Sequence, residues 1–429
     1  MKYVAKRGFY LLFTVIMLIG GCASKEIESV HHQDNNSNGH DIKTVKIYQF
    51  KVEIAEALNR MKADFEQAYP DIKIDIQTVG GGVDYTAALK AKFAAQDEPD
   101  LFNIGGYEEM NVWMDHLEEL TDQPWVQDAI PIAKEPVMKD GKLYGMPINL
   151  EGYGFIYNKD LFAQAGITTL PKTLTQLKEA AMKLQAAGIT PFINGYQERW
   201  IVGTHNLNVA FAHQENPDQF INEMNKGVAS MQGNVQFENW SALLDLTLQY
   251  GNKSPLTTDY NAQVTSFAEG KFAMMQQGNW TQVQIDNVNP NLNLGILPMP
   301  IDEDEVKNDK LLAGVPNHWV INKDSAVKEE AKLFLNWMVS SEKGKQYITQ
   351  EFKFIPAFYS IPANPTELGD LAAEVIRYSQ DNKVLSWNWF KYPDGITQDF
   401  GSTIQDYIAG SIDKSELFRG LDRVWGSYR

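Results

Sequence analysis

Residues 44–76 read TVKIYQFKVEIAEALNRMKADFEQAYPDIKIDI, and this stretch decides the fold. Apolar and polar residues alternate over 45–48 and again over 72–77, which predicts two strands. Between them, an apolar stripe at steps of four and three predicts an amphipathic helix that ends before Pro70: Ile54, Leu58, Met61, Phe65 and Ala68. Strand, helix and strand make a βαβ unit, whose crossover requires two parallel strands with a right-handed connection.

The α/β pattern continues downstream. Residues 100–104 form a third short apolar segment that runs into two glycines and predicts another strand, so an open α/β sheet begins the folded body. Segments 174–187 and 327–338 have helical stripes, and Thr173 is the predicted N-cap of the first. Residues 298–305, with two prolines and an acidic run, predict a surface connection between larger units.

The composition is that of an ordinary globular protein. Of the 429 residues, 44% are apolar, 22% are charged and 11% are aromatic. The chain is therefore not disordered as a whole, and its length predicts about two or three domains. Its net charge of −17 repels phosphates, so we expect no nucleic acid partner.

A single cysteine, Cys22, excludes an internal disulfide and zinc sites built on several thiolates. It follows three basic residues, the apolar run 9–19 and two glycines, an order typical of a secretory signal. Residues 19–22 resemble the lipobox of bacterial lipoproteins, which predicts a signal peptide over 1–21 and a lipid on Cys22 that anchors the chain to the cell membrane. The alternative is an ordinary signal peptide with an incidental cysteine. Removing residues 1–21 takes away three positive charges and no acids, which leaves −20.

Residues 22–42 are polar and lack apolar periodicity, which predicts a flexible tether between the lipid and the folded body. Three histidines lie in this segment and offer metal ligands: His31, His32 and His40. A solvated linker without fixed geometry is the better interpretation of them, so we expect no metal ion there.

The sequence lacks recognisable catalytic motifs. The triple glycine at 80–82 follows a strand, but no Gly-Lys-Ser/Thr follows it, so these glycines predict a tight turn and not a phosphate loop. There is no H-E-x-x-H and no G-x-S-x-G, and the seven histidines show no metal-ligand spacing. Carboxylates are plentiful, but the sequence alone does not show whether two of them lie at the separation that glycoside hydrolysis needs. These negatives give no evidence of catalysis, although a Ser/His/Asp triad and a glycosidase pair stay open, and we expect a protein that is not an enzyme and that holds no cofactor and no metal ion.

Tryptophans in polar surroundings are the strongest functional signal. Five of them lie among amides, carboxylates and turn-forming residues, outside helical stripes: Trp200, Trp280, Trp319, Trp387 and Trp389. An indole presents a flat apolar face and one N–H donor, and its polar neighbours add hydrogen-bonding groups. Together they match a sugar, which has C–H faces and hydroxyls. Each tryptophan alone is equally consistent with core packing, and only their recurrence favours a binding cleft.

Several further segments resemble one known family, the extracellular solute-binding proteins of carbohydrate ABC importers, which includes maltose-binding protein. Besides the lipobox and the opening βαβ unit, these segments are 99–103, 141–147, 157–162, 267–274 and 331–337. Each is weak alone, and their order and spacing from residue 45 to the C-terminus carry the resemblance.

The resemblance implies an α/β fold of two lobes, with a hinge and a ligand cleft between the lobes. Each lobe is built from discontinuous segments, the first from 43–128 and 309–345 and the second from 129–308 and 346–429. A ligand bridges the two lobes, and the closed form is stabilised by contacts that exist only when both lobes engage it.

The resemblance also implies a set of ligand-binding positions. Carried over residue by residue, they are Lys51, Glu53, Asn103, Tyr107, Glu151, Gln197, Trp200, Trp280, Asn317, His318, Trp387, Asn388 and Trp389. The physical pattern independently supports Lys51 and Glu53, because they follow the first strand and ligands gather at the carboxyl ends of parallel strands.

Three choices stay open among these positions. The family has a tryptophan near Asn103 where this chain has none, and Tyr107 is the predicted substitute. Trp387 and Trp389 compete for one stacking position. A lone histidine such as His318 is more often a structural group than a ligand contact.

The function implied by the resemblance is that of the substrate-binding component of a carbohydrate ABC importer. A lipid-anchored monomer outside the cytoplasm captures an oligosaccharide and delivers it to membrane permease subunits. Two alternatives stay open. A secreted carbohydrate-active enzyme would share the signal peptide and the aromatic cleft. A binding protein for another solute, such as a polyamine, would share the scaffold, and the acidic balance suits a cation.

Overall fold

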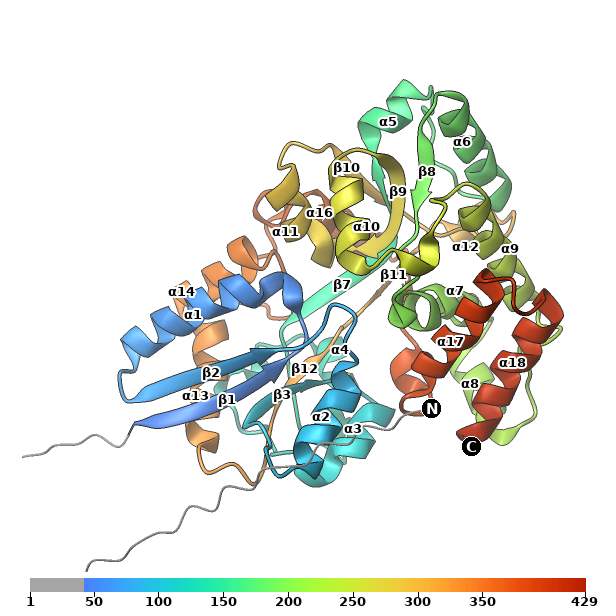
Figure 1. Ribbon diagram of the computed structural model, residues 1–429. Helices are drawn as coiled ribbons and strands as arrows, with labels where there is room; N and C mark the ends of the chain where they lie inside the picture. Colours follow the sequence, from blue (N-terminus) through green and yellow to red (C-terminus); the bar gives the residue numbers. More distant parts are fainter. Residues whose placement is uncertain (1–41) are drawn as a thin grey trace, which may run out of the picture. The chain divides into compact units, whose positions relative to one another are not determined.

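Residues 42–429 are described by the computed structural model of the chain (Figure 1). The predicted signal peptide, Cys22 and the predicted tether as far as Asp41 lie outside the described residues. Within 42–429 no helix is long and apolar enough to cross a membrane. Two β-sheets with separate hydrophobic cores organise this part of the chain.

The first sheet is built on the predicted βαβ unit. Its strands, in spatial order, are β2 (Ile72–Thr78), β1 (Lys43–Gln49), β3 (Leu101–Ile104), β12 (His318–Ile321) and β6 (Met146–Pro147). β1 runs parallel to β2, with Val45 opposite Ile74, and parallel to β3, which confirms the three predicted strands and their pairing. β12 runs antiparallel to β3 and to β6 and brings a distant part of the chain into the sheet.

Helices cover both faces of the first sheet. They are α1 (Ala55–Ala68), α2 (Tyr85–Ala94), α3 (Glu108–Trp113), α4 (Pro131–Lys134), α13 (Lys328–Ser340) and α14 (Glu342–Gln346). Figure 1 shows α1 on one face and α2 and α3 on the other, because the connections from β1 to β2 and from β2 to β3 cross the sheet in opposite directions. The carboxyl ends of β1 and β3 therefore meet at the position where open α/β sheets bind ligands.

The second sheet is organised around one long strand, β7. Its path runs through β14 (Val384–Ser386), β11 (Leu311–Gly314), β7 (Asn149–Asn158), β9 (Phe272–Gly278) and β8 (Thr190–Ile193), and β10 (Leu294–Leu297) and β13 (Ile355–Pro356) also pair with β7. Nearly every residue of β7 is buried, because strands from several distant segments flank it. A hairpin of β4 (Met138–Lys139) and β5 (Lys142–Leu143) stands apart from both sheets.

Helices surround the second sheet as well. They are α5 (Lys159–Gln164), α6 (Leu174–Ala186), α7 (Leu207–Ala212), α8 (Pro217–Lys226), α9 (Val235–Gln249), α10 (Tyr260–Ala268), α11 (Gln282–Val288), α12 (Glu305–Asn308), α15 (Pro365–Leu368), α16 (Asp370–Gln380), α17 (Ile396–Ile408) and α18 (Lys414–Ser427). Both predicted helices are confirmed: α6 begins after Thr173, whose side chain accepts from the Gln176 N–H, and the later stripe is α13. A π-helical turn, η5 (Ile201–Asn206), leads into α7.

The chain passes from one sheet to the other at few places. Ile148 joins β6 to β7, and residues 315–317 join β11 to β12. The chain crosses again between Ile361, which packs in the core of the first sheet, and Leu368, which packs in that of the second. Short crossings between two large cores are what a two-lobed fold with a hinge requires.

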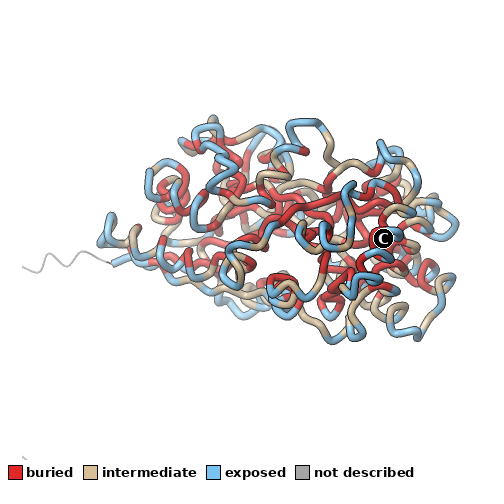
Figure 2. Tube along the Cα trace, turned by 90° about the horizontal axis from the view of Figure 1, so that it is seen from above, coloured by how far each residue is buried: buried red, intermediate tan, exposed pale blue. Residues whose placement is uncertain are grey.

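The two cores divide the chain differently from the predicted lobe boundaries. Those boundaries place residues 129–148 and 346–361 in the second lobe, whereas their buried apolar residues pack around the first sheet, except Ile355 of β13, which packs in the core of the second sheet. Conversely, β11 pairs within the second sheet although 309–345 is expected in the first lobe. Apolar segments next to a crossing fit either core locally, so only tertiary contacts assign them. Figure 2 shows the outcome as buried chain along the middle of the trace and exposed chain along its margins.

The predicted connection between larger units at 298–305 is wrong. This segment joins β10 to β11 within the second sheet, and Met299 and Ile301 are buried in its core. Its acidic end is a helix start, because the Asp304 carboxylate accepts hydrogen bonds from the first N–H groups of α12. The prolines and acids thus mark a turn inside one lobe.

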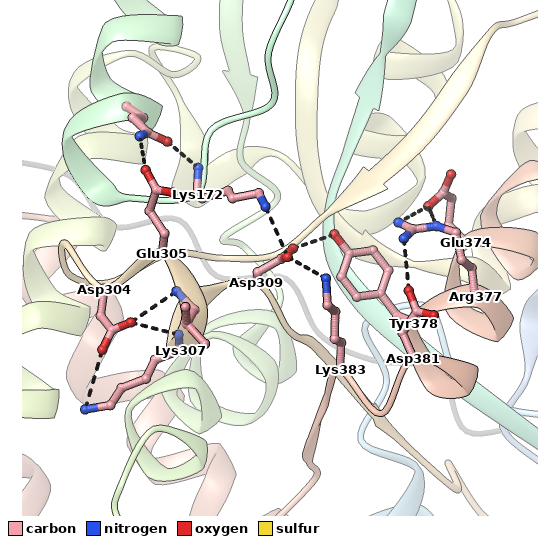
Figure 3. Close-up of polar contacts among 12 residues, drawn as sticks. Lys172, Asp304, Glu305, Lys307, Asp309, Glu374, Arg377, Tyr378, Asp381 and Lys383 are labelled. Carbon is pink, nitrogen blue, oxygen red and sulfur yellow. Dashed lines mark hydrogen bonds and ion pairs between the residues drawn. The ribbon is translucent and has the colours of Figure 1, made fainter.

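Asp309, just before β11, ties distant segments of the second lobe together (Figure 3). Its carboxylate accepts hydrogen bonds from Lys383 at 2.8 Å, Lys172 at 3.2 Å and the Tyr378 hydroxyl at 3.2 Å. These partners precede β14, precede α6 and lie on α16, respectively. The C-terminal segment is therefore held to the sheet by polar contacts as well as by core packing.

Candidate functional site

A cleft of about 570 Å³ lies between the two lobes. Lys51 and its neighbours, which follow β1, line it from the first lobe, and residues around Trp200, Trp280 and Trp389 line it from the second. Its position next to the carboxyl end of β1 agrees with the strand order of the first sheet.

Aromatic rings from the second lobe line one side of the cleft. Five of them, Trp200, Tyr260, Trp280, Trp387 and Trp389, we call the aromatic wall, and Phe390, Tyr392 and Tyr428 also line the cleft from this lobe. Tyr260 begins α10, and Trp280 lies in the short helix η7 (Asn279–Thr281) directly after β9. Trp387 follows β14 and Trp389 begins η9 (Trp389–Lys391). The wall therefore gathers the ends of strands and the starts of helices from four distant parts of the chain.

The pair at the C-terminal end of this wall is held rigidly. Trp387 and Trp389 stack with ring centroids 4.6 Å apart and planes at 30°. The Asn388 N–H between them donates to Asn208 Oδ1 at 3.1 Å, and the Tyr153 ring of β7 lies 5.9 Å and 6.1 Å from the two indoles. β7 and buried amides thus orient the rings without help from a ligand.

Two glycines leave room for the tryptophans. A Cβ at Gly278, the last residue of β9, would lie 2.0 Å from the Trp280 ring, and one at Gly314, the last residue of β11, would lie 2.8 Å from the Trp387 ring. Any larger residue at either position would displace its indole. The sheet therefore ends in glycine where the aromatic wall begins.

Charged side chains line the cleft from the first lobe and the adjoining end of β7. Five of them, Lys51, Glu53, Lys90, Glu109 and Glu151, we call the charged wall, and Asp84 also lines the cleft. Glu151 lies on β7, three residues after the crossing at Ile148. The other four belong to segments that pack on the first sheet.

Lys51 is the centre of a buried ionic cluster. Its Nζ lies 2.5 Å from Glu151 Oε1 and 3.0 Å from Glu53 Oε1, and all three side chains are less than 10% exposed. Burial by itself lowers the pKa of Lys51, but the two carboxylates outweigh it and hold that pKa above its usual value. Burial raises the pKa of Glu151, although Lys51 and an Asn149 hydrogen bond oppose the rise. Since Lys51 follows β1 and Glu151 lies on β7, the cluster links the two lobes at the hinge.

Glu109 lies on the charged wall where the second lobe covers it. Its carboxylate accepts a hydrogen bond from the Gly105 N–H at 2.8 Å. Burial, with a smaller contribution from Asp394, raises the pKa of Glu109 to about 7. Phe390 of the second lobe packs on Gly105 so closely that a Cβ there would lie 2.2 Å from its ring. The environment of Glu109 therefore depends on contact between the lobes.

Two further contacts join the lobes near Glu109. Lys90 of α2 forms an ion pair with Asp394, which precedes α17. The Lys391 ammonium lies 5.1 Å above the Tyr107 ring. We call the Lys90–Asp394 pair and the Lys391–Tyr107 contact the rim contacts. Of these four residues, Lys90 and Asp394 also line the cleft.

The structure brings together most of the predicted site residues. Those that line the cleft are Lys51, Glu53, Glu151, Trp200, Trp280, Asn317, Trp387 and Trp389. Both candidates for the late stacking position, Trp387 and Trp389, are in this set. The fifth polar-context tryptophan, Trp319, is buried in the core of the first sheet.

The remaining predicted residues do not line this cleft. Asn103 borders a separate space of about 20 Å³, and the Tyr107 ring belongs to the rim contacts. Gln197 is exposed, and its carbonyl accepts from Gln405. His318 is buried in β12 with Nε2 3.0 Å from the Ala133 carbonyl, and burial lowers its pKa to about 4, so it is a structural group. Asn388 shapes the turn behind Trp387 and Trp389. His318 and Asn388 each have a chain neighbour at the cleft, and the strand or turn directs their own side chains elsewhere.

Sequence reasoning missed His205, Tyr260, Glu109 and Lys90, which also line the cleft. A signal for His205 existed: it lies five residues after Trp200, and a π-helical turn places residues five apart on one face. Tyr260 begins a helix that carries no marked motif. Glu109 and Lys90 lie on helices whose polar residues are otherwise exposed, so local pattern does not separate them.

The triple glycine is the predicted tight turn. Gly81 and Gly82 have φ of +61° and +99°, and a Cβ at Gly80 would lie 2.4 Å from the Phe50 carbonyl oxygen. The turn lines the cleft from the first lobe. Among residues 42–429, no cluster of histidine, cysteine, aspartate or glutamate is arranged to hold a metal ion.

Known proteins share this architecture. The melibiose/raffinose/stachyose-binding protein MelE of Bacillus subtilis (strain 168) is 25% identical over 447 residues, which cover 99% of this chain and 97% of that protein. The multiple sugar-binding protein of Streptococcus mutans is 23% identical over 294 residues, 66% of this chain and 68% of that protein.

Solved structures agree in fold. RafE in complex with raffinose superposes with a TM-score of 0.78 at 22% identity, covering 90% of this chain and 99% of that one. A sugar transporter protein of Bacillus licheniformis, crystallised with stachyose, gives a TM-score of 0.76 at 21% identity, covering 90% of this chain and all of that one. Both are two-lobed solute-binding proteins, so the predicted fold class is confirmed.

The model of one protein family matches residues 51–345, which include β2, β3, β6 and β12 of the first sheet, the crossings at Ile148 and 315–317, and β7 to β11 of the second sheet. That family is described as bacterial extracellular solute-binding protein. The resemblance seen in the sequence is thereby confirmed, and the chain belongs to the bacterial extracellular solute-binding protein family.

Proposed function

We propose that this chain is the substrate-binding component of a carbohydrate ABC importer and that it captures an oligosaccharide between its lobes. One observation carries the proposal: the five rings of the aromatic wall line the cleft from the second lobe, and the charged wall lines it from the first lobe and β7. Stacking rings match the C–H faces of pyranoses, and ionised or amide groups match their hydroxyls. Such a cleft suits a neutral, polyhydroxylated ligand.

The relatives narrow the ligand class. MelE is named for melibiose, raffinose and stachyose, and structural neighbours were solved with raffinose and stachyose. These sugars share a galactose joined by an α-1,6 bond. We therefore propose α-galactosides as the first class to test, with maltotriose as a second because another relative is named for it.

The remaining parts of the proposal follow from the family and the sequence. Closure brings the lobes into the form that a membrane permease accepts, and another subunit hydrolyses ATP. The first lobe comprises about residues 42–148 and 318–361, and the second most of the rest. Cys22 carries the lipid that holds the receptor at the outer face of the cell membrane, as a monomer. A Cys22→Ser variant should then appear in the culture medium, and retention at the membrane would contradict the anchor.

Isothermal titration tests the sugar assignment. Purified protein is titrated with melibiose, raffinose, stachyose and maltotriose, and its thermal unfolding is followed with each sugar. We expect heat with at least one α-galactoside and a rise in Tm, since a ligand present at a hundred times its Kd stabilises by about 2.7 kcal/mol. The absence of both binding heat and a change in Tm with every sugar would contradict the proposal. Sugar products in the same samples would identify an enzyme instead.

A cationic ligand is the second candidate, because carboxylates are numerous around an aromatic cleft. Most of these acids already have partners: Glu53 and Glu151 share Lys51, Asp394 pairs with Lys90, and Asp399 accepts from the Tyr428 hydroxyl. A titration with spermidine separates the two candidates. Binding of spermidine without binding of any sugar would favour the cation.

A further inference from the structure

His205 lies in the middle of the aromatic wall, on the π-helical turn η5. Its ring stacks on Tyr153, with centroids 4.8 Å apart and planes at 19°. The centroids of Trp200, Trp280 and Trp389 lie 5.1 Å, 5.2 Å and 5.1 Å away. The imidazole also lines the cleft. A polar ring is thus surrounded by the rings that would stack on a sugar.

The imidazole of His205 is neutral at physiological pH. Burial, with a smaller contribution from the Lys51 charge, lowers the pKa of His205 to about 3. A neutral imidazole has one N–H donor and one nitrogen acceptor. His205 therefore offers hydrogen bonding without charge.

The surroundings of the ring decide which nitrogen holds the proton. His205 Nδ1 is buried and has no hydrogen-bond partner among residues 42–429. A buried N–H without an acceptor is costly, so the proton belongs on Nε2. Since Nδ1 is buried and the ring lines the cleft, Nε2–H is the donor on the cleft side.

We propose that His205 is a specificity-determining residue, whose neutral Nε2–H donates a hydrogen bond to one oxygen of a pyranose ring stacked on the aromatic wall. This inference rests on the proposed function. Stacking orients one face of a sugar on the rings. It does not discriminate between sugars that differ in hydroxyl configuration, because every pyranose has such a face. A donor held at a fixed place among the rings selects sugars that have an oxygen at the matching position.

The backbone supports this role. The Tyr153 hydroxyl donates to the His205 carbonyl at 2.8 Å, and the Tyr153 ring lies under the imidazole, so both ends of the residue are positioned by β7. An N–H donor at this place also disfavours a protonated amine, which has only donors to offer. His205 therefore separates sugars from one another and from cations.

The test compares His205→Phe with wild type by isothermal titration with raffinose, or with the sugar of the panel that binds wild type most tightly. Phenylalanine keeps the stacked ring and removes both nitrogens. We expect affinity to fall about tenfold, the size expected for one lost hydrogen bond. His213→Phe is the matched control. His213 lies in the same lobe outside the cleft lining, with Nδ1 2.8 Å from the Val209 carbonyl, and its variant should bind as wild type does.

Monodeoxy analogues of the same sugar separate recognition from packing. Wild type should bind one analogue about tenfold more weakly than the parent sugar, whereas His205→Phe should bind that analogue and the parent equally. Equal losses for every analogue in both proteins would overturn the inference, since packing alone would then explain His205. A wild-type protein that binds no sugar would instead refute the proposed function.

Nitrogen NMR of histidine-labelled wild type gives a readout that does not require a variant to fold. We expect His205 to be neutral with its proton on Nε2 at pH 7, and its Nε2 shift to move when the sugar is added. A doubly protonated ring at pH 7 would contradict the inference. So would nitrogen chemical shifts of His205 that stay unchanged when a sugar binds.

Discussion

The aromatic wall and the charged wall line the same cleft but are built differently. The aromatic wall comes from the second lobe, and its rings are held by β7, by buried amides and by glycines that leave room for the indoles. The charged wall comes mainly from the first lobe, and its members bond to each other or to groups across the cleft. One wall is preorganised within a lobe, whereas the other depends on how the lobes meet. We therefore expect the first to set affinity and the second to couple binding to closure.

The largest effect is expected from Lys51→Met, which leaves Glu53 and Glu151 buried without their counter-ion. We expect the free energy of unfolding to fall by about 3 kcal/mol, since removing one partner of a buried ion pair leaves an uncompensated charge. Chemical denaturation measures it. Lys142→Met is the control because its pair with Glu119 is at the surface, and it should leave stability unchanged. If both variants unfold alike, the charged wall does not join the lobes at the hinge.

Next in size is Trp280→Ala on the aromatic wall. We expect raffinose affinity to fall by about 2 kcal/mol, or roughly thirtyfold, because a buried aromatic anchor is removed from the cleft. Trp280→Phe should lose much less, since a stacking face remains. Isothermal titration measures both. Affinity that stays at the wild-type value after Trp280→Ala would remove this ring from the site and weaken the contrast between the walls.

Glu109 is expected to make ligand affinity depend on pH. Its pKa is about 7 in this structure, where the lobes are in contact beside it, and separation of the lobes should return the pKa towards the ordinary glutamate value of about 4.3. The closed form then binds the proton more tightly, so closure is favoured at low pH and weakens as pH rises to 7. Because Glu109 is only partly buried, we expect affinity to fall about threefold to tenfold between pH 5 and pH 7 and to level off above.

Titrations of Glu109→Gln across the same pH range check the assignment. That variant should show a flat profile, whereas Glu108→Gln, an exposed neighbour on α3, should keep the wild-type profile. A pH dependence that survives in Glu109→Gln would assign the proton to another group.

The smallest effect is expected at the rim contacts. Lys90→Ala removes the pair with Asp394, but the Lys90 side chain is 45% exposed, so we expect about a twofold loss of affinity at low salt. The loss should vanish at high salt, where charges at a surface are screened. Lys92→Ala, on the same helix but paired with Asp97 inside the first lobe, is the control. A loss that is large and independent of salt would show that the rim does more than align the lobes.

Much of the fold was readable from the sequence because its signals are local. The alternation in β1 and β2, the stripe of α1 and the cap at Thr173 each involve residues within a few positions of one another. The lobe boundaries were not readable in this way. Residues 129–148 are apolar enough for either core, and only their packing around the first sheet places them there.

The residues of the candidate site also differ in how far the sequence predicted them. Trp200, Trp280, Trp387 and Trp389 stood out because polar neighbours surround them along the chain, and all of them line the cleft. Trp319 has the same kind of surroundings but lies in β12, where the pleat turns its ring into the core. For His205 the sequence offered one signal, Trp200 five residues earlier, because the rings of Trp280 and Trp389 come from segments far away in sequence.

The sequence by itself determined the α/β class, the opening βαβ unit and the presence of several tryptophans suited to binding sugars, because periodicity and residue type are local properties of the chain. Only the tertiary structure decided which tryptophans form one wall, that Lys51 meets Glu151 one hundred residues away, and that His205 is partly buried and neutral. These properties arise from burial and from contacts between distant segments, and no local pattern encodes them.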